Sequence, residues 1–208
     1  MSTFLRNLTL VGLLAATAVG DHGPGAGGSQ ATAVDVTLTE LRERPDQWLG
    51  ERVTTIVQLA EIGGDWMPWT SRFGPDDFVR VEAWGDEQLP WYRAEYDDPA
   101  RFLFVRRDST VEFMLEHSNP HDRFLAVVEL REVLLGRPWI EIVSLSRVRP
   151  AIGEGAVIHA AKALELAERE GFELAISEAR RALASPLPDH AAADLNEKID
   201  LWRRAMGR

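Results

Sequence analysis

Histidine is the first candidate for chemistry, because an imidazole can bind a metal ion or transfer a proton near neutral pH. Among the five histidines, only His117 and His121 lie close together in the sequence. A spacing of four residues would place both on one face of a helix, but Pro120 between them interrupts a helix. The spacing therefore predicts a turn that carries two exposed histidines, and no metal site.

Acidic residues occur as adjacent pairs, which can do acid–base work only in a pocket that separates their pKa values. The pairs Asp76–Asp77, Asp86–Glu87 and Asp97–Asp98 each lie in a polar, loop-like stretch. None has the Asp-x-Asp-x-Asp-Gly spacing of a calcium loop. We expect these carboxylates to lie on the solvated surface, with weak calcium binding as the alternative.

Common motifs of nucleophilic catalysis, phosphate binding and zinc-dependent hydrolysis are absent from the sequence. The chain has no Gly-x-Ser-x-Gly, no phosphate-binding glycine loop, no His-Glu-x-x-His and no cysteine. A hydrolase would require at least three members of one charged set to meet in a cleft: Arg80, Glu82, Asp86, Arg106, Arg107, Asp108, His117 and His121. Nothing in their spacing requires this, so we predict no catalytic residue and no cofactor.

The N-terminus indicates where the protein works. Residues 1–20 contain one arginine, an uncharged stretch from Leu8 to Val19 and the small-residue triplet 16–18, features of a secretory signal peptide. That stretch is shorter than the roughly 20 residues needed to span a bilayer. A glycine-rich linker over 21–34 follows. We expect a periplasmic or secreted protein with no transmembrane segment after signal removal; an uncleaved anchor or a chance apolar N-terminus is the alternative.

Composition narrows the class of partner. The formal net charge is −10, whereas nucleic-acid-binding proteins cluster lysine and arginine against phosphates. Without cysteine the chain forms no disulfide, so a packed core must stabilise it. These features argue against nucleic acid and point to a protein or a glycan of the cell envelope.

The chain has two regions of different pattern. Residues 35–150 hold six of the seven tryptophans and most of the alternating, β-branched runs. A capping box at Thr37 and Glu40 predicts a short helix that ends before Pro45. Strands are predicted at 53–60, 78–84, 101–105, 123–133 and 139–148, with a helix at 109–116 whose middle could equally be extended.

Five strands with a helix between the third and fourth resemble the OB-fold, and specifically its exported bacterial variants. The entry into the first strand is similar to theirs at Pro45, Trp48, Leu49, Gly50 and Val53. Two segments depart from a minimal barrel of this kind, the long loop 63–77 and the insertion 90–99. Another small β-barrel or a β-sandwich is the alternative fold.

The OB resemblance implies a ligand groove across strands two and three, flanked by the first-second and fourth-fifth loops. On that resemblance, aromatic and arginine side chains would line it: Trp66, Trp69, Arg72, Arg80, Trp84 and Trp139. Flat rings in such a groove stack on sugars or bases, and arginine adds hydrogen bonds. The competing interpretation is that these tryptophans pack the core and loops.

Residues 151–208 are rich in Ala, Leu and Glu and predict three helices, at 156–170, 172–184 and 189–206. Small residues at Ala163, Ala175, Ala179 and Ala182 make this tail similar to one tetratricopeptide repeat. A three-helix cap on the barrel is the alternative.

The sequence thus predicts an α+β protein, with an OB-like five-stranded barrel at 35–150 and a helical tail at 151–208. Its predicted role is that of an exported, non-catalytic binding or scaffolding protein that engages an envelope protein or glycan. A metal-dependent or nuclease-like hydrolase on the same barrel is the alternative, and a purely structural module is the third possibility.

Overall fold

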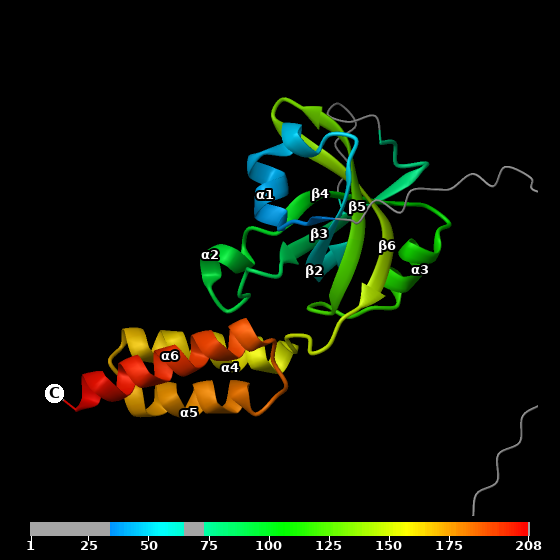
Figure 1. The fold of residues 1–208 in the computed structure, drawn as a ribbon. Helices are drawn as coiled ribbons and strands as arrows, with labels where there is room; N and C mark the ends of the chain where they lie inside the picture. The colour runs from blue at the N-terminus through cyan, green and yellow to red at the C-terminus, as the bar shows by residue number, and fades with distance from the viewer. Residues whose placement is uncertain (1–33, 65–72, 208) are drawn as a thin grey trace, which may run out of the picture. The chain divides into compact units, whose positions relative to one another are not determined.

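A computed structural model describes residues 34–64 and 73–207, which form an α+β fold: a five-stranded mixed β-barrel, then three helices packed together (Figure 1). The predicted signal peptide, residues 21–33 of the predicted linker, and Trp66, Trp69 and Arg72 lie outside the described residues. Within the described part, no helix has the length and apolar character that crossing a membrane requires.

Five strands close the barrel: β2 (Arg52–Ile62), β3 (Phe78–Gly85), β4 (Ala100–Arg106), β5 (Arg123–Leu134) and β6 (Arg137–Arg147). β2 pairs antiparallel with both β3 and β5, β3 pairs with β4, and β5 with β6. A parallel pairing of β4 with β6 completes the ring, so the barrel order is β2-β3-β4-β6-β5. A two-residue strand, β1 (Val34–Asp35), adds to β2 in parallel.

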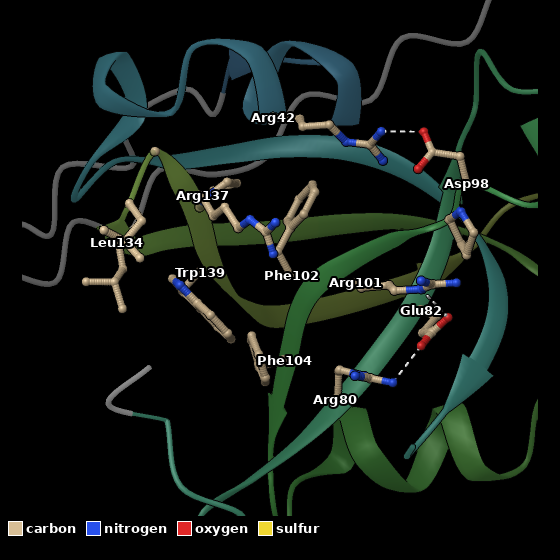
Figure 2. A pocket seen from close by; sticks show the side chains of 14 residues that line it. Arg42, Arg80, Glu82, Asp98, Arg101, Phe102, Phe104, Leu134, Arg137 and Trp139 are labelled. Carbon is tan, nitrogen blue, oxygen red and sulfur yellow. Dashed lines mark hydrogen bonds and ion pairs between the residues drawn. The ribbon is translucent and has the colours of Figure 1, made fainter. Parts of the chain in front are cut away.

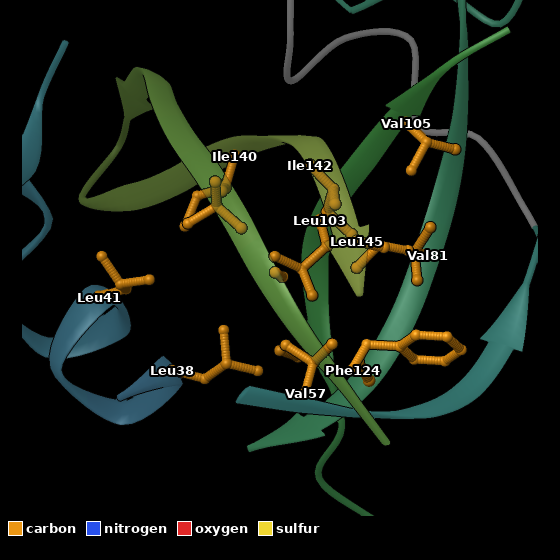
Figure 3. Packing of buried hydrophobic residues seen from close by; sticks show 14 of the residues in the cluster. Leu38, Leu41, Val57, Val81, Leu103, Val105, Phe124, Ile140, Ile142 and Leu145 are labelled. Carbon is orange, nitrogen blue, oxygen red and sulfur yellow. The ribbon is translucent and has the colours of Figure 1, made fainter. Parts of the chain in front are cut away.

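Alternation along the strands fills the barrel interior, because successive side chains point to opposite faces. Val81 of β3, Leu103 of β4 and Ile140 of β6 are buried in one cluster (Figure 3). Phe124 is fully buried in the same cluster, with no exposed fraction. Val79, Val81 and Ala83 alternate along β3: Val81 and Ala83 are buried in this core, and Val79 packs against it.

Short helices close the ends of the barrel. α1 (Leu38–Glu43) has the predicted capping box, in which Thr37 accepts from the Glu40 N–H and the Glu40 carboxylate accepts from the Thr37 N–H. The 3-10 turn η1 (Pro45–Trp48) follows. α3 (Thr110–Glu116) begins at Ser109, whose hydroxyl accepts from the Glu112 N–H, so the extended alternative for this stretch is wrong.

The C-terminal helices are α4 (Glu154–Glu168), α5 (Phe172–Leu183) and α6 (Asp189–Met206), as the sequence predicted within a few residues. Small side chains at their contacts allow close packing, since alanine has no atoms beyond Cβ. The fully buried alanines of this segment are Ala160, Ala163, Ala175, Ala179, Ala182 and Ala191.

The insertion between β3 and β4 docks against the C-terminal helices. Its Leu89 and Trp91 are buried in one apolar cluster with Ile152 of the connecting segment and with residues of α4 and α6. The Trp91 indole N–H donates to Asp194 of α6 at 3.1 Å, and the Tyr92 hydroxyl donates to the same carboxylate at 2.8 Å. Burial, and then this carboxylate, raises the pKa of the Tyr92 phenol above its usual range, so the group stays a donor.

We expect Asp194→Ala to lower the free energy of unfolding by about 1–3 kcal/mol, because it leaves two donors of the insertion without their acceptor. Asp200→Ala on the same helix is the matched control, since that carboxylate is exposed and pairs only with Arg203. Urea denaturation of the full chain measures both. Equal effects of the two substitutions would contradict a specific role for Asp194.

A second polar cluster joins α4 to α5. Glu178 is buried on α5, where His159 contacts its carboxylate at 2.7 Å and Arg181 donates to it at 2.9 Å. Lys162 lies 3.5 Å away. The hydrogen bond from His159, and then the charges of Arg181 and Lys162, hold the pKa of Glu178 below its ordinary value.

Because the folded pKa of Glu178 is the lower one, its contribution to stability is present at neutral pH and is lost as pH falls through that pKa. Glu178→Gln should therefore be less stable than the wild type at pH 7, and the difference should shrink as pH falls below about 4. Urea denaturation across pH 3–7 measures it. Glu165→Gln, at an exposed ion pair on α4, should show a small difference with little pH dependence; a constant gap for Glu178→Gln would refute the linkage.

Candidate binding groove

A cavity of about 910 Å³ lies on the outer surface of the barrel, over β3, β4 and the β5–β6 turn. Figure 2 shows Arg42 of α1 on one side of it, Arg80 and Glu82 of β3 on another, and Leu134, Arg137 and Trp139 of the hairpin facing them. The remaining lining residues are Asp98, Pro99, Arg101, Phe102, Phe104, Leu135, Gly136 and Pro138.

The outward orientation of the groove residues follows from strand alternation. Val81, Leu103 and Ile140 point into the core. Their neighbours therefore point outward: Arg80 and Glu82 on β3, Phe102 and Phe104 on β4, and Trp139 on β6. The same periodicity that fills the barrel thus builds the groove on its other face.

A short seam between β4 and β6 gives the groove its depth. These strands pair only at Leu103–Ile140 and Phe104–Glu141, whereas the β5–β6 ladder continues to Leu134–Arg137. The hairpin therefore extends past the last β4–β6 pair, and its tip stands beside β4 without a ladder between them. The gap between the hairpin tip and β4 forms part of the cavity.

Aromatic rings make the floor of the groove. The ring of Phe104 stacks on Trp139 at 4.9 Å between centroids and on Phe73 at 5.0 Å. Phe104 is 1% exposed, while Trp139 and Phe102 are half-buried and reach the cavity. The Trp139 indole nitrogen is buried, and no described residue accepts a hydrogen bond from it.

The groove is cationic although the chain is acidic. Among its described lining residues, four arginines stand against two carboxylates, a surplus of two positive charges on a chain whose net charge is −10. Arg42 pairs with Asp98 at 2.6 Å, and Glu82 accepts from Arg80 at 2.7 Å and from Arg101 at 3.2 Å. Arg137 is exposed, and no ion pair joins it to another described residue.

Of the ligand-binding residues expected from sequence, the structure brings Arg80 and Trp139 together in this cavity. Trp84 lies elsewhere and is 4% exposed, with its indole N–H donating to the Tyr96 carbonyl at 3.1 Å and its ring stacked on His121 at 5.0 Å. The other three expected residues lie outside the described part of the chain.

One expectation about histidine is wrong. His117 is exposed as predicted, but His121 is 5% exposed beneath Trp84, and its burial holds its pKa below the ordinary value. Tertiary packing against a distant strand decides this, so the local turn pattern could not reveal it. Within residues 34–64 and 73–207, no three His, Asp or Glu side chains converge as metal ligands would.

The paired carboxylates are exposed as expected, with one exception. Asp86 is partly buried, and both its oxygens accept from Arg123, at 2.6 and 2.7 Å. The charged set proposed for a hydrolase is dispersed: only Arg80 and Glu82 reach the groove, while Arg106 pairs with Glu141 on the barrel surface.

Several groove residues were missed from the sequence. Phe102 and Phe104 carried a usable signal, since they alternate with core residues in the strand 101–105. Arg42 and the hairpin tip carried none, because they reach the groove from segments distant in sequence.

No protein-family model, no curated protein and no solved structure matches the chain.

The Trp139 indole N–H provides a stability test of the groove floor. Trp139→Phe keeps an aromatic ring on Phe104 and removes only a donor that no described residue uses, so we expect the free energy of unfolding to change by less than about 1 kcal/mol. Trp139→Ala removes the ring and should cost about 3 kcal/mol. Urea denaturation distinguishes them, and equal losses would show that folding depends on the indole N–H.

Proposed function

We propose that this chain is an exported, non-catalytic binding protein, whose barrel holds an extended segment of an envelope protein or a glycan in the groove over β3 and β4. The observation that carries the proposal is the position of the cavity. It lies over the second and third strands of the barrel and the turn between the fourth and fifth, the surface to which the OB resemblance assigns the ligand.

The order of the elements supports the OB interpretation. The barrel strands follow one another along the chain as β2 to β6, with α3 between the third and fourth of them, and non-consecutive strands β2–β5 and β4–β6 close the ring. A closed barrel leaves few free strand edges, so its outer face is available for binding without inviting strand-to-strand aggregation.

The chemistry of the groove supports binding over turnover. The acids among its described lining residues, Glu82 and Asp98, are each ion-paired with arginine, and none of those described residues is a histidine or a serine. A general base must reach its substrate in an unpaired, proton-accepting form, which salt bridges oppose. No observation in the described residues favours the hydrolase alternative.

In this proposal the helical tail has a scaffolding role. The segment between β3 and β4, residues 86–99, contributes Asp98 and Pro99 to the groove and also contacts α6 through Trp91 and Tyr92. The tail therefore supports the segment that forms one rim of the groove.

Binding by the full-length protein tests the proposal directly. We would screen it against purified envelope glycans and against a displayed random dodecapeptide library, then measure affinities by calorimetry. Phe102→Ala should weaken the selected ligand roughly tenfold, because it removes an apolar side chain from the groove. Phe113→Ala, at an exposed ring on α3 outside the groove, should leave affinity unchanged. Failure of both ligand classes to bind, or equal loss in the two variants, would refute the proposal.

A further inference from the structure

The tip of the β5–β6 hairpin has a backbone that its sequence does not favour. Leu134 pairs with Arg137 across a two-residue turn, and both turn residues have positive φ, 52° at Leu135 and 73° at Gly136. Such turns favour asparagine, aspartate or glycine, because a left-handed backbone brings the Cβ of other residues too close to the following carbonyl. Leucine is therefore unfavourable for the turn itself.

Leu135 is also unfavourable for contact with water. It is 89% exposed, the highest value among the exposed large apolar side chains of the described residues, and it lines the groove. A residue that helps neither the turn nor solvation of the surface points to a contact outside the chain.

An exposed guanidinium lies close to this leucine. Arg137 is two residues from Leu135, lines the groove and is exposed. Its guanidinium has no partner among the described residues, whereas Arg42, Arg80 and Arg101 are each paired with a carboxylate. One guanidinium can donate two parallel hydrogen bonds to one carboxylate, so an acidic group suits this end of the groove.

The apolar lining favours a peptide over a sugar. Sugar recognition needs open aromatic faces, but Phe104 stacks with both Phe73 and Trp139, and Arg42 lies 5.7 Å over the Phe102 ring. The rest of the apolar lining is aliphatic or proline: Pro99, Leu134, Leu135 and Pro138. Such surfaces pack well against aliphatic side chains.

We propose that the groove binds an acidic segment of another protein, in which an apolar side chain lies next to an aspartate or a glutamate. Leu135 contacts the apolar side chain, and the exposed Arg137 guanidinium binds the carboxylate. The surplus of positive charge in the groove complements such a segment. This assignment rests on the proposed binding function and narrows its two ligand classes to one.

The test uses the full chain and the peptides selected from the dodecapeptide library, with polygalacturonate as the acidic glycan for comparison. We expect the selected peptides to be enriched in Asp or Glu beside Leu, Ile or Phe, and to shift the Trp139 indole proton in NMR spectra. That signal is assigned by its absence in Trp139→Phe. Arg137→Ala should weaken the peptides roughly tenfold, and Arg169→Ala, at the C-cap of α4, should leave affinity unchanged.

Leu135→Asn separates a binding role from a structural one. Asparagine suits the turn, so Tm should rise while peptide affinity falls roughly tenfold; Leu174→Asn, at an exposed leucine of α5, should leave affinity unchanged. A fall in Tm with no change in affinity would overturn the role of Leu135.

The outcomes of the two ligand classes are distinguishable. Binding of polygalacturonate alone would overturn the acidic-peptide assignment and leave the proposed binding function standing. Selection of basic peptides, or of peptides indifferent to Arg137→Ala, would overturn the assignment in the same way. Binding of neither class would overturn the proposed function as well.

Discussion

Closure of the barrel depends on one short parallel pairing, between β4 and β6, and much of the remaining architecture follows from it. Only Leu103–Ile140 and Phe104–Glu141 form this seam, so the ring closes while the two strands separate beyond it. A longer seam would bring the hairpin tip against β4 and fill the space that is now the groove. The closed ring also fixes which face of each strand is core and which is surface.

Charged residues are distributed unevenly over the barrel. The chain has an excess of acids, yet the described lining of the groove has four arginines and two carboxylates. Internal ion pairs hold three of those arginines in place and neutralise part of their charge, while Arg137 stands at the rim without such a partner in the described residues. Positioned arginines define the shape of the groove, and the remaining charge defines which ligands suit it.

The insertion between β3 and β4 links the two halves of the described fold. Its Tyr96 carbonyl accepts a hydrogen bond from the Trp84 indole, and its Asp98 lines the groove. Its Trp91 and Tyr92 donate hydrogen bonds to Asp194 of α6. A minimal barrel has no need of this segment. Its length and its aromatic residues are explained by the surfaces that it joins.

Local patterns in the sequence were enough to predict the five strands, the capped helix at Thr37, the three C-terminal helices and the α+β class, because alternation, capping and helical periodicity depend on neighbouring residues. The OB resemblance implied Arg80 and Trp139 as groove residues, and it also implied Trp84, which lies elsewhere. The burial of Trp84 against His121, and the convergence of Arg42, Phe102 and Leu135 on the same cavity as Trp139, became known only from the folded structure. Burial and convergence depend on which distant segment covers a residue, and barrel closure, which no local pattern encodes, sets that.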